Sequence, residues 1–294
     1  MSMTKYLLLL LTLGAAWLAG AAEPEKAAPA APALPFKIER FAFPGPVAGV
    51  LARVDLTDPR VHVKVALSDD RDPDGDGPCL GRLDTTSSAA RRYDFALTVN
   101  AGFFAEQPPG VSTGGGPKYV VGNCALPVGW HFAEGRTVKP STKYARAVLV
   151  VHNDGKITLH EELAEMPADA RYAVGGSGVV LREGMNVADA KNTARHPRTA
   201  VGISADQHTL LLVTVDGRQD SSRGVTLVEL SDLMLKLGAQ QALNLDGGGS
   251  STLVVKDSVT GVYAIANHPS DKALATPEVN VERPVADVLG ISLK

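Results

Sequence analysis

The stretch that decides the fold lies at residues 242–255, ALNLDGGGSSTLVV. A short apolar run ends in Asp246, and three glycines, two serines and a threonine follow before a second apolar run begins. Glycine loses more conformational entropy on folding than any other residue and contributes no side-chain packing. A triple glycine beside a carboxylate therefore indicates backbone that bends sharply or lies very close to another group.

The segments around this stretch predict a chain with many strands. The flanking apolar runs predict strands at 242–245 and 252–255. Residues 227–237 predict an amphipathic helix, because Thr226 and Glu229 have the spacing of a capping box and leucines recur on one face. Further strands are expected at 50–56 and 61–67 as a hairpin, at 95–99, at 145–151 and 156–160 around an Asn-Asp-Gly turn, and at 199–204, 210–215 and 287–293; a short helix is expected at 84–93.

This pattern predicts an α+β fold class, with a mixed β-sheet core and a few packed helices in a single globular domain. That domain is expected to span residues 36–294. Residues 23–35 are rich in alanine and proline, which is typical of a semi-extended linker.

The first 22 residues predict a signal peptide. A lysine precedes an apolar run, and Ala-Gly-Ala at 19–21 fits a cleavage site. The alternative is an uncleaved membrane anchor. The signal peptide predicts a secreted or periplasmic protein with no stable membrane span after cleavage. In such a protein the two cysteines, Cys79 and Cys124, favour one disulfide over a pair of buried thiols.

Composition argues against a nucleic-acid partner. The 294 residues carry a formal net charge of -3, and aromatic residues make up 5% of the chain. The chain therefore lacks both the positive charge that attracts phosphate backbones and an aromatic platform for stacking bases.

Two aspartates stand where an apolar strand meets a glycine: Asp216 in LLVTVDGR and Asp246 in ALNLDGGG. Asp-Gly after a strand is common turn chemistry, which is the simpler interpretation. The repetition, once within a triple glycine, favours a site instead. Consecutive backbone N–H groups in such a turn form an anion-binding nest, and a carboxylate at its rim can act as a base or nucleophile.

Other polar residues extend this candidate site. Arginines bind phosphate through paired N–H donors, although most arginines are simply surface residues. Asn100, which ends a predicted strand, is either a turn residue or an amide for hydroxyl recognition. His196 is kept as a candidate because it lies two residues before Arg198. The candidate substrate-binding residues are Asn100, Gly102, Arg198, Thr199, Arg218, Gly247, Gly248, Gly249, Ser250, Ser251 and Arg283.

An acidic loop is the one candidate for a metal. Asp72, Asp74 and Asp76 have the spacing of the first calcium ligands of an EF-hand, but Leu83 stands where the bidentate glutamate is required. The loop is either a weak Ca²⁺ site or an acidic surface loop. No other cofactor is expected.

Several stretches together resemble the phosphodiester glycosidase domain family. They are VNAGFF (99–104), HPRTAVGIS (196–204), the long block from LLLVTVDGR to LDGGGSSTLVV (210–255), NHPSD (267–271) and ERPVADVLGI (282–291). The resemblance implies an exported enzyme that cleaves the glycosidic C1–O bond of a sugar-1-phosphodiester. It implies Asp246 as nucleophile or base with Asp216 as alternative or partner, phosphate binding by Arg198 and Arg283, and sugar binding by Asn100.

Two other functions stay open at this point. A metal-dependent phosphodiesterase would cut P–O rather than C–O, but the metal-ligand spacing that it needs is absent from the sequence. A non-catalytic polysaccharide-binding or envelope assembly protein would bind the same glycans without turnover. Expected substrates are sugar-phosphodiesters or polysaccharides of the envelope or of exopolysaccharides.

Overall fold

A computed structural model describes residues 33–75, 77–105, 119–133, 135–140, 145–273 and 275–294. The predicted signal peptide and nearly all of the predicted linker lie outside the described residues. Residues Leu34–Lys294 form one compact unit. No helix in the described ranges has the length and apolar character needed to cross a membrane.

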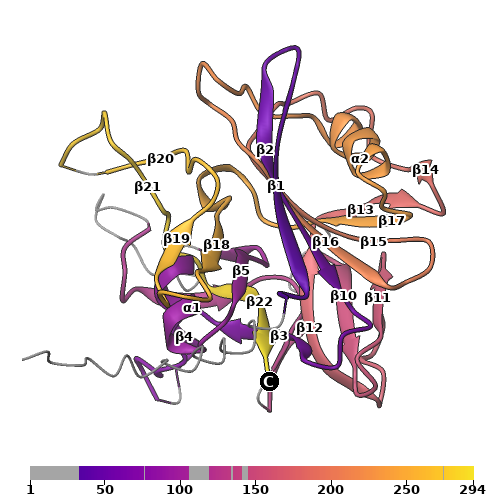
Figure 1. Cartoon of the computed structure of the whole chain (residues 1–294). Coiled ribbons are helices and arrows are strands. Elements are labelled where there is room, and N and C mark those ends of the chain that lie inside the picture. The colour runs from indigo at the N-terminus through magenta and orange to yellow at the C-terminus, as the bar shows by residue number, and fades with distance from the viewer. Residues whose placement is uncertain (1–32, 76, 106–118, 134, 141–144, 274) are drawn as a thin grey trace, which may run out of the picture. The chain divides into compact units, whose positions relative to one another are not determined.

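The largest sheet has seven antiparallel strands in the order β1-β2-β16-β15-β17-β13-β14 (Figure 1). Its strands are β1 (Phe36–Phe43), β2 (Val47–Asp55), β16 (Thr209–Val215), β15 (Arg198–Ile203), β17 (Gln241–Asn244), β13 (Gly178–Arg182) and β14 (Met185–Asn186). The strands β15, β16 and β17 at its centre are almost entirely buried.

Two five-stranded sheets complete the main framework. The first has the order β19-β18-β5-β22-β3 and the second has the order β11-β10-β12-β8-β9. Their strands are β19 (Tyr263–Ile265), β18 (Leu253–Lys256), β5 (Leu97–Asn100), β22 (Asp287–Leu293), β3 (Val61–Leu67), β11 (Ile157–His160), β10 (Ala147–His152), β12 (Ala170–Gly176), β8 (His131–Ala133) and β9 (Arg136–Val138). Two small sheets pair β4 (Gly81–Arg82), β7 (Cys124–Pro127) and β6 (Phe104–Ala105), and β20 (Asp271–Lys272) with β21 (Asn280–Val281).

The side chains of β16 alternate between two buried faces. Leu210 and Leu212 join a core with residues of β5, β10 and β22, whereas Leu211 and Val213 pack with Leu230 of α2 (Leu227–Lys236). The sheet is therefore covered on both sides, which explains why its central strands are continuous apolar runs rather than alternating ones.

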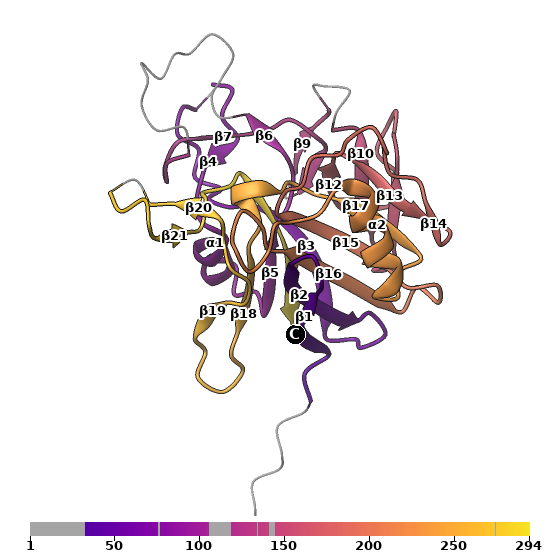
Figure 2. The same ribbon diagram turned by 90° about the horizontal axis from the view of Figure 1, so that it is seen from above.

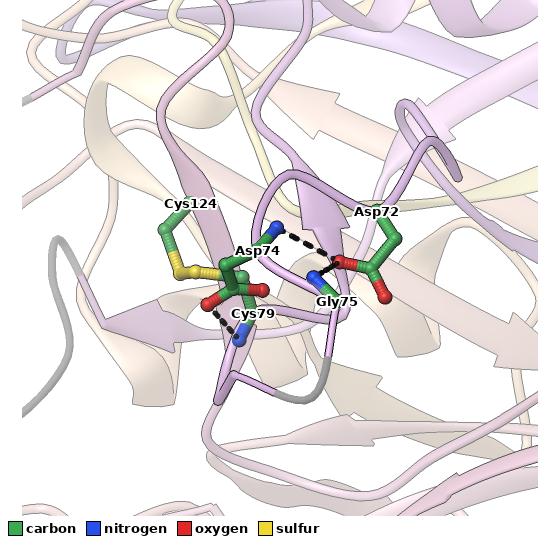
Figure 3. Close-up of a disulfide and its surroundings, with 5 residues drawn as sticks. All are labelled: Asp72, Asp74, Gly75, Cys79 and Cys124. Atoms are coloured by element: carbon green, nitrogen blue, oxygen red, sulfur yellow. Dashed lines mark hydrogen bonds between the residues drawn. A yellow bond between two sulfur atoms is a disulfide. The ribbon is translucent and has the colours of Figure 1, made fainter.

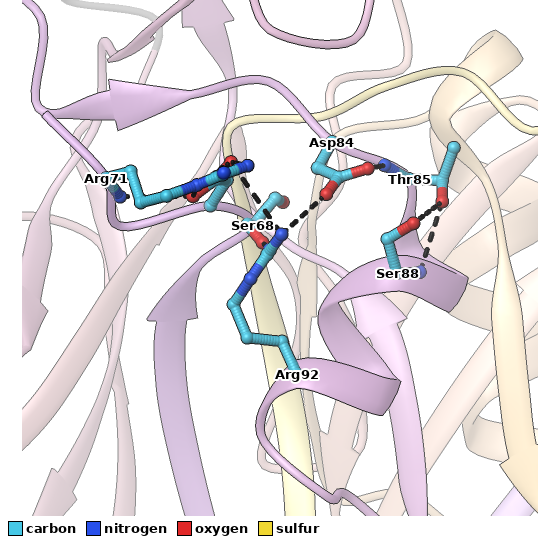
Figure 4. Close-up of polar contacts among 7 residues, drawn as sticks. Ser68, Arg71, Asp84, Thr85, Ser88 and Arg92 are labelled. Atoms are coloured by element: carbon cyan, nitrogen blue, oxygen red, sulfur yellow. Dashed lines mark hydrogen bonds and ion pairs between the residues drawn. The ribbon is translucent and has the colours of Figure 1, made fainter. Parts of the chain in front are cut away.

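The two helices in the described residues begin at side-chain caps. Thr226 and Glu229 form the predicted capping box of α2. For α1 (Thr86–Arg92), the Thr85 hydroxyl accepts a hydrogen bond from the Ser88 N–H at 3.1 Å. At the other end of α1, Arg92 donates to Asp84 at 2.9 Å and also to the carbonyl of Ser68, which fixes the helix to the segment after β3 (Figure 4).

The fold is more strongly β than the sequence indicated, and one predicted pairing is wrong. The 50–56 and 61–67 strands exist, but β2 pairs with β1 and β16, whereas β3 pairs with β22 in another sheet. Because β2 has hydrogen-bonded neighbours on both edges, it has no free edge for β3. The predicted hairpin between β10 and β11 is confirmed.

Candidate active site

The glycine-rich stretch connects two sheets. It leaves β17 of the seven-stranded sheet, makes one turn of 3-10 helix at Gly248–Ser250, and enters β18 of the neighbouring sheet (Figure 2). Asp246 lies at the start of this crossing. Its N–H donates to the Ala101 carbonyl at 2.9 Å, and its carbonyl accepts from the Asn100 amide at 2.7 Å. The position of Asp246 is therefore set by the end of β5.

The three glycines of this crossing, Gly247–Gly249, form what we call the glycine loop. Gly248 has a φ of 64°, a left-handed conformation that side chains with a β-carbon rarely adopt. The loop is also a place of close approach. A β-carbon on Gly247 would lie 2.7 Å from the Pro197 carbonyl oxygen, so the backbones of these two segments touch directly.

Three arginines, Arg198, Arg218 and Arg283, form what we call the arginine cluster, and each lies against one glycine of the loop. The distance from the β-carbon position of the glycine is 3.7 Å for Arg198 Cδ at Gly247, 3.0 Å for Arg218 Nη2 at Gly248 and 2.6 Å for Arg283 Cζ at Gly249. The glycines therefore give space to arginine side chains as well as to the turn itself.

Each arginine is held differently. Arg283 makes two hydrogen bonds to Asp271, at 3.0 and 3.2 Å, and its guanidinium carbon lies 4.0 Å from the centre of the Tyr119 ring. Arg198 is buried and donates to the carbonyls of Val225 and Ala194, at 3.2 Å each.

Arg198 and Arg218 differ from Arg283, which is paired with Asp271. Within the described ranges, no carboxylate forms an ion pair with either one, and Arg218 is solvent-exposed. Burial lowers the pKa of Arg198, because its charge is poorly solvated. Two unneutralised cations beside three backbone glycines make a site suited to an anion.

Asp246 is the carboxylate at the head of the glycine loop. Its Oδ1 accepts the Gly247 N–H at 2.9 Å. Burial raises its pKa to about 6, against the lowering effects of the Ser250 hydroxyl, Arg283 and the Gly247 N–H, and Asp287 raises it further. The residue still keeps part of its surface open to solvent. A carboxylate with a raised pKa that remains accessible has the properties of a catalytic acid or base.

Two serines, Ser250 and Ser251, follow the glycine loop directly. Ser250 Oγ and Ser251 Oγ are buried and make no hydrogen bond to any part of the chain that the structure describes. Ser250 therefore influences the Asp246 carboxyl by proximity rather than through a well-formed hydrogen bond. Other buried hydroxyls of the described structure, such as those of Thr98 and Thr214, also have no partner, so Ser250 and Ser251 are distinguished by their place beside Asp246.

Asp216 has a different environment from Asp246. It is buried, and its Oδ1 accepts from the His268 N–H at 2.9 Å and from the Asn267 amide at 3.2 Å. Its Oδ2 lies 3.2 Å from His268 Nδ1. Both oxygens of Asp216 are thus occupied by residues 267–268. The same segment contacts the glycine loop, because Ser270 Oγ donates to the Gly248 carbonyl at 3.3 Å.

Three other predicted residues hold the framework of the site together. Asn100 is fully buried, and its Oδ1 accepts from the Thr199 hydroxyl at 2.7 Å and from the Thr252 N–H at 3.2 Å. The Gly102 N–H donates to Asp287 Oδ1 at 2.7 Å. Asn100, Gly102 and Thr199 therefore connect the end of β5 with β15, with β22 and with the residue that precedes β18.

The sequence reasoning missed a buried histidine–carboxylate pair. His131 Nδ1 lies 3.0 Å from Asp287 Oδ2, and both side chains are inaccessible to solvent. Asp287 was present in the quoted ERPVADVLGI stretch, but His131 stands in a segment without a motif. His268 was also missed as a candidate, although it lies in the quoted NHPSD stretch. Burial, and then the positive charges of Arg198 and Arg218, lower the pKa of His196.

The acidic loop is folded around its own backbone. Asp72 Oδ1 accepts the N–H groups of Asp74 and Gly75, at 3.0 and 2.9 Å, and Asp74 Oδ2 accepts the Cys79 N–H at 3.3 Å (Figure 3). Asp76 lies outside the described residues. Among the described residues, no group of three His, Cys, Asp or Glu side chains is placed to hold a metal ion. Cys79 and Cys124 are joined by a disulfide.

Comparisons with known proteins place the chain in a family. A family model described as phosphodiester glycosidase matches residues 93–292, which include every residue of the glycine loop and the arginine cluster. The N-acetylglucosamine-1-phosphodiester alpha-N-acetylglucosaminidase of Bos taurus is 27% identical over 222 residues. The match covers 68% of this chain and 38% of that enzyme, so the chain spans well under half of the relative's length.

Two further proteins are similar to this chain, one in sequence and one in fold. The prophage-derived protein YomE of Bacillus subtilis (strain 168) is 41% identical over 98 residues, 33% of this chain and 13% of YomE. The catalytic domain of the zebrafish N-acetylglucosamine-1-phosphodiester alpha-N-acetylglucosaminidase has a similar fold, with a TM-score of 0.62 at 21% identity over 88% of this chain and 82% of that one. The chain therefore belongs to the phosphodiester glycosidase family, hydrolases that act on glycosidic bonds.

Proposed function

We propose that the protein is an exported hydrolase that cleaves the glycosidic C1–O bond of a sugar-1-phosphodiester. The observation that carries this proposal is the placement of one carboxylate, Asp246, at the head of a glycine loop lined by three arginines. Arginines and backbone N–H groups suit the phosphate, and the carboxylate suits the sugar carbon.

In this proposal Asp246 either attacks C1 or removes a proton from the attacking water. With a pKa of about 6, the carboxyl is roughly nine-tenths ionised at pH 7. Its negative charge also favours the oxocarbenium-like transition state of glycoside cleavage. The arginine cluster stabilises the charge that develops on the departing phosphate.

The remaining predicted residues take supporting roles. Ser250 and Ser251 offer their unpaired hydroxyls, together with the N–H groups of the loop, to substrate oxygens. Both polar atoms of the Asn100 amide already bond to protein groups, so we assign Asn100 to holding the Asp246 backbone rather than to sugar hydroxyls.

The natural substrate is proposed to be a phosphodiester-linked glycan of the cell envelope or of an exopolysaccharide, which an exported enzyme would meet. The export step is tested by expressing the full chain and sequencing the N-terminus of the mature protein. A start near residue 23 supports export, and an intact N-terminus contradicts it.

The activity is tested with UDP-GlcNAc as a model sugar-1-phosphodiester. We expect the purified protein to release GlcNAc, and Asp246→Asn to lose at least about 10³-fold in kcat while it stays folded. Absence of turnover on every sugar-1-phosphodiester tested, with retained glycan binding, would instead favour a binding protein. Unchanged turnover in folded Asp246→Asn would remove that residue from catalysis.

A further inference from the structure

A second histidine–carboxylate pair lies beside the glycine loop, and its histidine faces solvent. Asp216 is buried, with 4% of its side chain exposed, whereas the His268 side chain is 66% exposed. His268 Nδ1 lies 3.2 Å from Asp216 Oδ2, and the His268 N–H donates to Asp216 Oδ1 at 2.9 Å. One buried carboxylate therefore holds both the backbone and the ring of this residue.

This pairing fixes which ring nitrogen is free. A carboxylate accepts hydrogen bonds, so Nδ1 carries the proton that points at Asp216. Nε2 lies on the opposite side of the ring, and no described residue forms a hydrogen bond with it. A histidine oriented in this way through Nδ1 presents Nε2 for proton transfer.

The pair is attached directly to the candidate site. The Asn267 amide donates to the Ser251 carbonyl at 3.0 Å, and Ser270 Oγ donates to the Gly248 carbonyl at 3.3 Å. Arg218 follows Asp216 by two residues, and its guanidinium lies over Gly248. The segment that carries His268 and the Arg218 guanidinium therefore both adjoin Gly248 of the glycine loop.

We propose that His268 is a catalytic residue whose Nε2 donates a proton to the departing phosphate, with Asp216 as its positioning residue. This inference rests on the proposed function. When the C1–O bond breaks, its electron pair stays on the phosphate oxygen, and a diester with one negative charge becomes a monoester with two. The proton from Nε2 leaves a singly charged monoester and a neutral imidazole, which regains a proton from water.

The chemistry of the leaving group explains why histidine suits this step. The second ionisation of a phosphate monoester has a pKa of about 6, close to the ordinary range of imidazole. A strong acid is unnecessary for such a leaving group, but a matched donor lowers the barrier to charge build-up. Asp216 holds the ring through Nδ1 at 3.2 Å, which is the positioning part that a buried carboxylate plays beside a catalytic histidine.

The test compares two model substrates, the methyl and the p-nitrophenyl esters of GlcNAc-1-phosphate. The phosphate that leaves from the nitrophenyl ester is less basic and needs less protonation. We expect His268→Gln to lose about 10²- to 10⁴-fold in kcat on the methyl ester and distinctly less on the nitrophenyl ester. Asp216→Asn should show the same preference, and the double variant should lose no more than His268→Gln alone.

The chain offers a matched control at the other end of β16. His208 is 64% exposed and lies 3.7 Å from Asp206, so His208→Gln removes an equally exposed histidine beside an aspartate and should leave both rates unchanged. Equal losses on the two esters, or no loss, in folded His268→Gln would overturn the inference and leave the proposed function standing. Failure of the wild-type protein on both esters would overturn the proposed function and the inference with it.

Discussion

The Arg283 guanidinium occupies the space beside Gly249, with Cζ 2.6 Å from the position that a β-carbon on that glycine would take. The same guanidinium donates from Nε and Nη2 to Asp271, and its carbon lies 4.0 Å from the centre of the Tyr119 ring. Arg283 is thus held by Asp271 and Tyr119 and lies against the backbone of Gly249. Its position depends directly on the absence of a side chain at residue 249.

Gly249→Ala should therefore displace Arg283. A clash with a held side chain costs about 1–3 kcal/mol in the free energy of unfolding, and we expect kcat/KM to fall by about 10²-fold as the guanidinium moves. The measurements are urea unfolding and hydrolysis of UDP-GlcNAc. Gly178→Ala is the matched control, because a β-carbon at Gly178 meets nothing within 4 Å and should change neither quantity.

Asp246→Asn should stabilise the folded protein at neutral pH while removing activity. The folded-state pKa of Asp246, about 6, lies above the ordinary value of 3.8. Its contribution to stability is therefore fully present below pH 3.8 and is lost as the pH rises through 6. We expect a gain of about 1–3 kcal/mol for Asp246→Asn at pH 7.5 and little or none at pH 4, by urea unfolding at both values. A gain that does not depend on pH would contradict the raised pKa.

The same pKa predicts the acidic limb of the activity profile. If the ionised carboxylate is the reactive form, kcat/KM falls about tenfold per pH unit below pH 6. The profile should be measured on UDP-GlcNAc between pH 4 and 8. A flat profile through pH 6 in the stable protein would mean that the rate does not depend on the ionisation of Asp246, and a fall above pH 6 would mean that the protonated form reacts.

Arg218 should contribute to activity and not to stability. It is exposed and has no hydrogen bond in the described part of the chain, so its truncation leaves the fold intact. We expect Arg218→Ala to lower kcat/KM by about 10- to 100-fold, because one charge-assisted contact to phosphate is removed. Arg40→Ala, an exposed arginine on the edge strand β1, is the control for loss of surface charge.

Cys79 and Cys124 should contribute chiefly to stability. The disulfide joins residues separated by 45 positions, and a closed loop of that length stabilises a protein by about 2–4 kcal/mol. The double variant Cys79→Ser and Cys124→Ser should lose that amount in urea unfolding. At temperatures where the variant stays folded, its kcat should match that of the wild-type protein. The disulfide joins β7 to the segment before β4, and neither carries a residue of the candidate site.

The sequence predicted those parts of the site that lie in one continuous pattern. Local sequence patterns alone predicted Asp246, the glycine loop and the arginine cluster. Local patterns could not distinguish Asp216 from Asp246, because both follow an apolar strand and precede glycine. Their difference comes from residues 267–268, which approach Asp216 from more than 50 positions away.

Long-range packing also explains the other differences. No local sequence pattern marks His131, because its contact with Asp287 joins residues 156 positions apart. The wrong hairpin between β2 and β3 had good strand patterns and a good turn, but each strand pairs with more distant partners. Strand identity is therefore readable from periodicity here, whereas strand partners depend on which faces the whole fold buries.

The central claim, C1–O cleavage at the carboxylate and arginine site, is tested most directly by the position of a solvent oxygen in the products. UDP-GlcNAc is hydrolysed in oxygen-18 water, and GlcNAc and UDP are analysed by mass spectrometry. Cleavage of the C1–O bond predicts heavy oxygen at C1 of GlcNAc and none in UDP. Heavy oxygen on UDP would contradict it, because the broken bond would then be P–O and the protein would act as a phosphodiesterase.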